Sequence, residues 1–390
     1  MKKRNIVILT LLISIIILFI YPGKLFAAQK YYLHSLVQQT MTPDIEKAIN
    51  LWVDFLYEEN DSLRKTYWSQ DEVERFGDDY CLFCTSFFYQ WGRAITLNRL
   101  LPYIIYVEEK DSVFIITTMF MEKSFALSDS SLKNQSPWGI IKVVVEKNNN
   151  SFALKNDLSE EARFWYRFEA GNINYYVEPT VKIDTAVCYE ANNYVNYISN
   201  LWYGKDYINK IEYYVAPTSA AVNKLVGFEF GFLGGIGEGY TLINAKAILS
   251  GNKNFNYKHE LTHLILPEIP NQLLSEGLAT YFGGTGDLDF ETAVKKFSEK
   301  NYPLNDEKIK DILDYPVFFE FYVFSALACE QVYKSKGIDG LRELSKNIIK
   351  TEGEDFHKEN KIMLERICNM LGVGESELIE RVNNRIKSFK

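Results

Sequence analysis

Residues 259–263 read His-Glu-Leu-Thr-His, a spacing that suits metal chemistry. In a helix, His259 and His263 stand one turn apart on the same face, so both imidazoles can bind one ion while Glu260 projects beside them. The chain has only 4 histidines in 390 residues, so this arrangement rarely arises by chance. The pattern predicts a hydrolytic metal site; the alternative is a helix with two surface histidines and unrelated acidic neighbours.

The residue types define the expected roles. A catalytic zinc takes three protein ligands and a water whose pKa falls to about 7. Glu260 is placed to take that water's proton and deliver it to the leaving group. Glu276 is the best candidate for the third ligand, because Pro267, Pro270 and Asn271 should end the first helix and turn the chain into a second one. One Zn²⁺ per chain is expected, although cobalt, manganese or iron fit the same ligands.

The second glutamate begins its own motif, since residues 276–281 read Glu-Gly-Leu-Ala-Thr-Tyr. Together the two motifs resemble those of the gluzincin zinc metallopeptidases, over roughly residues 180–350 and most strongly over 259–284. The resemblance implies the following site: zinc ligands His259, His263 and Glu276, with Glu260 as general base and acid. Some gluzincins place an orienting aspartate four residues after the ligand glutamate, where this chain has Thr280. A carboxylate from elsewhere or a backbone carbonyl must then orient the imidazole.

Flanking segments fit the same resemblance. Gluzincins carry a tyrosine that donates a hydrogen bond to the developing oxyanion, and Tyr322 fits by position, with Tyr281 and Tyr315 as rivals or with Tyr322 simply packed in the core. Residues 240–248 predict a short strand after the glycine-rich stretch 231–239. In gluzincins such an edge strand binds substrate backbone; an ordinary loop and strand is the alternative.

The N-terminus predicts export. A basic start, Lys2-Lys3-Arg4, precedes an apolar run over 6–21 and small residues before position 29, as in a secretory signal peptide over residues 1–28. The run has about sixteen residues, short of the roughly twenty that span a bilayer. We expect a periplasmic or extracellular protein; the alternative is an uncleaved N-terminal membrane anchor.

Composition suits a globular enzyme of two or three domains, with 47% hydrophobic and 15% aromatic residues. The net charge of -8 argues against binding to nucleic acid. We expect a peptide or protein substrate and no membrane span after signal removal. Cys81 and Cys84 predict a local disulfide or two buried thiols rather than a redox site. The three other cysteines, in apolar surroundings, are expected in the core: Cys188, Cys329 and Cys368.

The predicted fold class is α+β. Residues 29–165 form an N-terminal α+β domain of unknown role, with a helix over 41–66 and a curved antiparallel sheet. Its strands are expected at 103–107, 113–118 and 140–145. A hairpin tip is expected at 147–150.

Residues 175–390 are expected to form a zinc metallopeptidase-like catalytic domain, with a small sheet and a mostly helical remainder. The resemblance implies this gluzincin arrangement. The expected elements are a helix over 184–203, a strand over 210–216, and helices over 291–300, 318–336, 338–351, 359–371 and 376–390, with Gly337 as a helix stop. The other histidines, His34 and His357, lack ligand spacing.

These observations favour an exported zinc-dependent metallopeptidase. The main alternative is a catalytically silent exported binding protein with a structural or vestigial zinc site. Glu260 counts against it, because a structural site has no use for that carboxylate and normally closes with a fourth ligand. A third reading is a self-inhibited peptidase in which residues 30–165 cover the cleft.

Overall fold

The structure, a computed structural model, is a mixed α+β protein with 54% helix, two mixed sheets and a helical C-terminal region. This confirms the predicted α+β class. The described residues are 30–88, 92–123, 137–149, 151–231, 237–315, 318–346, 348 and 356–389, so the predicted signal peptide over 1–28 lies outside them. The chain divides into two compact units: Met1–Tyr67 with Trp91–Leu154, and Trp68–Gln90 with Lys155–Lys390.

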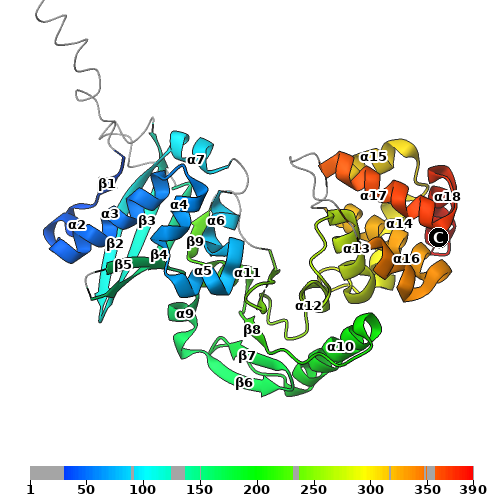
Figure 1. Ribbon diagram of the computed structural model, residues 1–390, viewed down its shortest axis with the longest axis horizontal. Coiled ribbons are helices and arrows are strands. Elements are labelled where there is room, and N and C mark those ends of the chain that lie inside the picture. Colours follow the sequence, from blue (N-terminus) through cyan, green and yellow to red (C-terminus); the bar gives the residue numbers. More distant parts are fainter. Residues whose placement is uncertain are drawn as a thin grey trace, which may run out of the picture. The chain divides into compact units, whose positions relative to one another are not determined.

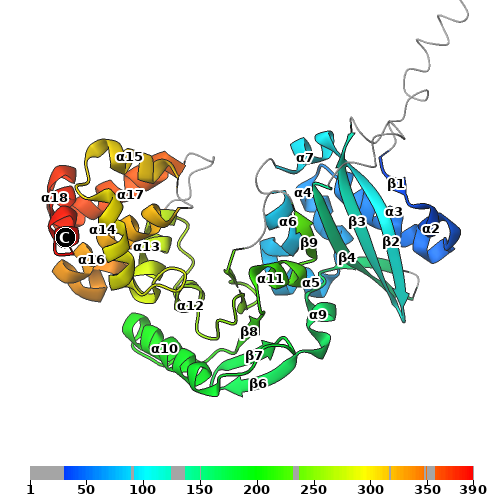
Figure 2. The same cartoon turned by 180° about the vertical axis from the view of Figure 1, so that it is seen from behind.

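The first unit is a sheet with the helix α3 packed against it (Figures 1 and 2). Trp52 of α3 is fully buried, and its indole N–H donates to the Thr118 hydroxyl of β3 at 2.9 Å. The strand order is β1-β2-β3-β4-β5, with β1 parallel to β2 and the β2–β3 and β3–β4 pairs antiparallel. The elements are β1 (Tyr32–Leu33), α2 (Ser35–Gln39), α3 (Pro43–Tyr57), α4 (Asp61–Arg64), η1 (Lys65–Tyr67), α7 (Arg93–Arg99), β2 (Leu100–Lys110), β3 (Val113–Glu122), β4 (Gly139–Asn148) and β5 (Ser151–Lys155).

Predictions for this unit are mostly confirmed. The three expected strands lie within β2, β3 and β4, and the expected hairpin tip contains Asn149 at φ 55°. The prediction of a purely antiparallel sheet was incomplete, because β1 pairs in parallel with β2. The helix expected over 41–66 starts at Pro43 but ends at Tyr57. It is shorter because Asn60 caps a separate helix, α4, through its side-chain oxygen.

The second unit contains a sheet of order β10-β11-β8-β7-β6. The β10–β11 and β6–β7 pairs are antiparallel, whereas β8 runs parallel to both β11 and β7. Helix α10 begins after Asp184, whose carboxylate accepts the Val187 N–H, and ends at the left-handed Gly204, as predicted. The elements before the metal-site helices are α5 (Gln70–Phe76), η2 (Gly77–Asp79), α6 (Leu82–Phe87), α9 (Leu158–Glu161), η4 (Ala162–Phe164), β6 (Tyr166–Ala170), β7 (Ile173–Val177), α10 (Thr185–Tyr203), β8 (Ile211–Val215), α11 (Ser219–Leu225), β9 (Phe228–Gly231), β10 (Gly239–Leu242) and β11 (Ala247–Ser250).

The prediction of one strand over 240–248 is wrong, because the chain forms the β10–β11 hairpin there. The Lys246 N–H donates to the Ile243 carbonyl at 3.2 Å, and Lys246 adopts φ 49°. The Asn244 amide donates to the Phe76 carbonyl of α5 at 3.3 Å. The turn is therefore closed locally and held by the segment 68–90. Residues 232–236 of the predicted glycine-rich stretch lie outside the described residues.

Helices make up the rest of the unit and pack together (Figure 1). They are α12 (Lys258–Ile265), α13 (Gln272–Gly283), α14 (Phe290–Asn301), α15 (Asp306–Asp314), α16 (Phe319–Leu344), α17 (Phe356–Leu371) and α18 (Glu375–Lys387). The predicted C-terminal helices are present, although the one expected over 338–351 ends at Leu344, and α15 had not been predicted. Gly337, at φ 64° and ψ -162°, interrupts α16 and confirms the predicted stop.

No single helix of the described residues is long and apolar enough to cross a membrane. Helices α15 and α16 reach that length and apolarity only when they are taken together, with a bend of 113° between them.

The cysteine predictions are confirmed. Cys81 and Cys84 form a disulfide, and the three remaining thiols are free and buried.

Candidate metal centre

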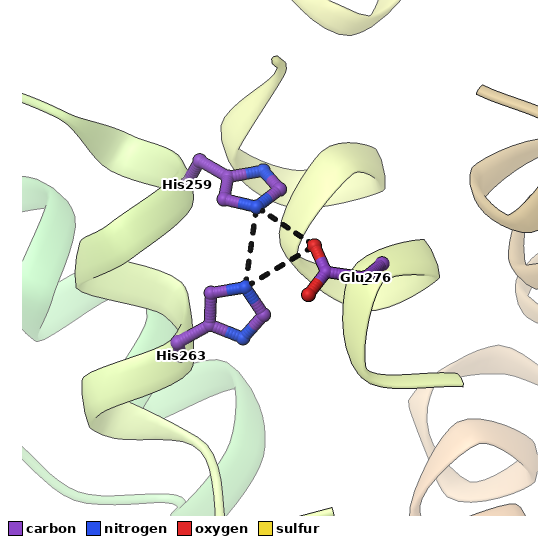
Figure 3. A group of neighbouring side chains, drawn as sticks. All are labelled: His259, His263 and Glu276. Carbon is purple, nitrogen blue, oxygen red and sulfur yellow. Dashed lines mark hydrogen bonds and ion pairs between the residues drawn. The ribbon is translucent and has the colours of Figure 1, made fainter. Parts of the chain in front are cut away.

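Two short helices carry the candidate ligands. Helix α12 places His259 and His263 one turn apart, and α13 carries Glu276 (Figure 3). The chain between them leaves the helical conformation at Leu266, and α13 starts where the Asn271 side chain accepts the Leu274 N–H. The three side chains point toward one another, as Figure 3 shows.

The three ligand atoms form a compact triangle. The Nε2 atom of His259 lies 3.2 Å from Nε2 of His263 and 3.1 Å from Oε2 of Glu276. Nε2 of His263 lies 3.5 Å from the same carboxylate oxygen. All three atoms fall within 4.8 Å of one another, and no fourth His, Cys, Asp or Glu among the described residues joins them. Two imidazole nitrogens and one carboxylate oxygen are the donors of many catalytic zinc sites.

Each imidazole has a partner on its other nitrogen. Nδ1 of His259 lies 2.8 Å from the Gly284 carbonyl oxygen, which can only accept, so Nδ1 carries the proton. Nδ1 of His263 lies 3.3 Å from the Ser275 hydroxyl. Both contacts direct Nε2 toward the centre of the triangle, as metal-binding histidines require. Thr280 takes no part, since its buried hydroxyl oxygen has no hydrogen-bond partner among the described residues.

Glycines allow the close packing around His259. A Cβ on Gly283 would lie 2.5 Å from the His259 backbone nitrogen. Gly284 adopts φ +82°, and a Cβ there would lie 2.2 Å from the Leu288 carbonyl oxygen. A Cβ on Gly277 would lie 2.7 Å from the Ser325 carbonyl oxygen of α16. The sequence therefore needs glycine at these positions to bring α13 and its following turn against α12 and α16.

The buried ligands form a charged pair. Burial opposes a charge on His259, but the hydrogen bond and the charge of Glu276 outweigh it and raise the pKa of His259 to about 9. Burial would likewise raise the pKa of Glu276, yet the neighbouring His263 and His259 hold that pKa well below its usual range. A metal cation bound to Nε2 would replace a proton there.

Glu260 lies against the edge strand β10. The Thr241 hydroxyl lies 2.7 Å from Oε2 of Glu260 and 3.0 Å from its backbone carbonyl oxygen. A Cβ on Gly239 would lie 2.9 Å from Cγ of Glu260 and 2.2 Å from the Tyr257 ring. The carboxylate is therefore held at the junction of β10 and the first turn of α12. β10 stands at the end of the sheet order, as strand addition requires.

The three candidate tyrosines occupy different places. The Tyr322 ring, in the first turn of α16, lies 5.9 Å from the His259 ring, measured between centroids. Tyr281 instead packs against Phe290 and Tyr333, at 5.1 and 5.6 Å. Tyr315 is 59% exposed at the end of α15. Of the three, Tyr322 has the ring contact with a candidate ligand.

Several site residues were not predicted from the sequence. Ser275 directly precedes Glu276 in α13. Its position as a polar residue next to a predicted ligand could have indicated that it contacts a ligand side chain. Gly284 follows α13, where unpaired helix-end carbonyls are expected. Thr241 contacts Glu260 only because β10 and α12 pack together, which no local pattern reveals. The other two histidines are elsewhere: His34 caps α2, and His357 pairs with Asp314 at 2.5 Å.

The donor set, the anchored Nδ1 atoms and the number of ligands all fit a zinc ion with an open coordination position. Models of known protein families and the curated proteins were both compared with this chain, and neither comparison gave a match.

Proposed function

We propose that the chain is an exported, zinc-dependent metallopeptidase of the gluzincin type, with its catalytic domain over residues 175–390. The observation that carries the proposal is the three-atom ligand triangle, within 4.8 Å, beside a carboxylate that is not part of it. The order of elements also supports it: edge strand β10, α12 with two histidines, α13 with the glutamate and α16 with Tyr322. Export rests on the N-terminal sequence.

His259, His263 and Glu276 would hold the zinc ion. When bound, zinc would supply a water that is acidic near neutral pH and a positive charge beside it. Glu260 accepts the proton of that water on its carboxylate and later gives it to the leaving amine. The Thr241 hydroxyl, 2.7 Å from Oε2, fixes the rotamer in which Glu260 does this.

Two further groups would act on the substrate. The Tyr322 hydroxyl donates a hydrogen bond to the oxygen that becomes negative as the carbonyl is attacked. Strand β10, which ends the sheet order among the described residues, would pair with the extended backbone of a peptide and fix the scissile bond beside Glu260. The substrate class is therefore a peptide or protein that presents an extended segment.

The main alternative is a silent binding protein with structural zinc. Structural zinc sites are normally closed by four protein ligands, whereas this group contains three among the described residues. A structural site also gives no role to Glu260 or to the hydroxyl that holds it. Both features favour the catalytic proposal.

Metal content tests the site first. Residues 29–390 and the Glu276→Ala variant would be dialysed against a weak chelator and measured by elemental analysis. We expect about one zinc per wild-type chain and a clear loss in the variant. A peptide library would then be assayed with both proteins, and we expect cleavage by the wild type alone. Zinc without any cleavage would favour the binding protein, and no zinc in either protein would contradict the site.

A further inference from the structure

A small cavity lies between α14, α15 and the start of α16. Its volume is about 230 Å³, and its apolar lining comprises Ile312, Tyr315, Phe318 and Phe321. Small-molecule sites usually occupy roughly 300–1,000 Å³. This cavity is smaller, so its size suits a single side chain better than a whole small ligand.

Two aromatic rings are unusually open at this cavity. Tyr315 is 59% exposed and Phe318 is 55% exposed, and their ring centroids lie 5.8 Å apart. Beneath them Phe321 is fully buried and Ile312 is 8% exposed. The cavity thus has an apolar floor and an aromatic mouth. Adjacent exposed aromatic rings are typical of a surface that binds an apolar group of a ligand or partner.

The rest of the lining is polar and consists of Asn301, Lys308, Asp311 and Glu320. The Lys308 ammonium donates to the carbonyls of Asn301 and Pro303, at 3.3 and 3.0 Å. Glu320 pairs with Lys300 at 3.3 Å, and Asp311 is exposed. Lys308 and Glu320 already have partners within the protein, so the aromatic and aliphatic part of the lining is the part that favours an uncharged, apolar occupant.

The mouth adjoins the candidate metal centre through one turn of helix. Phe318 caps α16, and its carbonyl accepts the Tyr322 N–H at 3.3 Å. Phe318 thus stands one helical turn before Tyr322, a rise of about 6 Å along the axis. The Tyr322 ring in turn lies 5.9 Å from the His259 ring. With these spacings, we expect a peptide whose scissile carbonyl lies at Tyr322 to bring a neighbouring side chain within reach of the cavity.

We propose that Tyr315 and Phe318 form a specificity pocket that takes one large apolar side chain of the substrate, such as leucine, methionine or phenylalanine. This inference rests on the proposed peptidase function and names the class of peptide that it favours. The two residues determine specificity and take no part in the bond-breaking step. Continuity with Tyr322 selects a substrate side chain as the occupant rather than a second protein.

The test compares peptides that differ at one position near the cleaved bond. Wild type, Phe318→Ala and Tyr315→Ala would each be given peptides with leucine, phenylalanine or alanine at successive positions. At one position, we expect the wild type to prefer leucine or phenylalanine over alanine by about 10-fold or more in kcat/KM. Either variant should lose most of that preference while kcat/KM for the alanine peptide stays within about twofold.

Phe164→Ala is the matched control, because Phe164 is a 75% exposed aromatic of the same unit, in η4. Zinc content and circular dichroism of each variant exclude misfolding as the cause. An equal loss on all peptides, or an unchanged preference, would overturn the pocket while leaving the peptidase proposal intact. If wild-type protein with bound zinc cleaves no peptide, the proposed function fails and the pocket fails with it.

Discussion

The Nδ1 atom of His259 donates a hydrogen bond to the backbone carbonyl of Gly284, 2.8 Å away. A main-chain oxygen thus performs the orienting task for which the sequence offers no aspartate at position 280. Its place depends on the backbone conformation of Gly284, at φ +82°, rather than on any side chain. Zinc affinity should therefore be sensitive to substitutions that alter the backbone after α13.

Gly284→Ala should weaken zinc binding by roughly 10–100-fold, as loss of a histidine's outer partner typically does. The new Cβ would lie 2.2 Å from the Leu288 carbonyl oxygen, so the turn must move. Competition with a chromophoric chelator measures the affinity. Gly286→Ala is the control, because Gly286 also has positive φ, +56°, but nothing within 4 Å of a Cβ. Equal zinc affinity in the two variants would contradict this role of Gly284.

Ser275→Ala should lower zinc affinity about tenfold, because the His263 imidazole loses the hydroxyl that lies 3.3 Å from Nδ1. Ser275→Thr keeps a hydroxyl and should restore most of the affinity. The same chelator competition measures both variants. If alanine and threonine behave alike, the hydroxyl has no orienting role.

Glu260→Gln should keep one zinc per chain and lose roughly 10²–10⁴-fold in kcat, since the amide cannot accept the water's proton. His259→Ala should lose both zinc and turnover. Elemental analysis and peptide hydrolysis on the same preparations separate the two effects. Retained hydrolysis in clean Glu260→Gln protein would falsify the mechanism.

Thr241→Val should reduce kcat by roughly tenfold with unchanged zinc content, because the isosteric side chain cannot hold the Glu260 carboxylate. The hydroxyl that it removes lies 2.7 Å from Oε2. Thr241→Ser should retain activity. A fall in zinc content or in thermal stability equal to the fall in kcat would point instead to a structural role for Thr241.

Glu72, which is 4% exposed, should make stability depend on pH. Burial raises its pKa, against the opposing hydrogen bonds from Asn156 and the charges of Arg75 and Lys155. The folded carboxyl therefore holds its proton more tightly than the unfolded one. Its stabilising contribution is present below the unfolded pKa and is lost as pH rises through the folded value.

Glu72→Gln removes the carboxyl and with it this pH-dependent contribution. The free energy of unfolding of the variant, relative to that of the wild type, should therefore increase as pH rises from about 4 to 7. Denaturant midpoints of both proteins across that range measure the difference. Asp71→Asn is a control on the same helix, since Asp71 has a lowered pKa and is largely exposed. A difference between Glu72→Gln and wild type that does not change with pH would rule out this effect of Glu72.

Local patterns predicted most of the helices and the strands of the first unit. Thr42 and Pro43 mark the start of α3, and Gly337 marks the break in α16, because capping and backbone restriction act over a few residues. The β10–β11 hairpin was missed, since 240–248 is apolar enough to read as one strand. The two sequence motifs predicted the three ligand residues of the triangle and Glu260 beside it. Gly284 and Thr241 contact these residues only through packing between distant segments, so no motif indicated them.

The grouping of residues 68–90 with the second unit has no local signal either. It depends on contacts such as Asn244 with Phe76, and Asn156 with Leu82, whose N–H donates to the Asn156 side chain at 2.9 Å. These partners are far apart in the chain, so periodicity cannot reveal them. Sequence patterns therefore predict elements more readily than they predict which elements pack together.

The start of α13 is tied to a helix that comes much later in the chain. The Leu273 N–H donates to the side chain of Asn360 at 3.2 Å, and the Asn271 amide donates to the Glu359 carbonyl at 3.2 Å. Synthesis proceeds from the N-terminus, so both histidines and Glu276 leave the ribosome well before Asn360 does. The nascent chain holds every zinc ligand while it still lacks the helix that anchors α13. We therefore expect α13 to be fixed in place only after residues 359 and 360 have been synthesised.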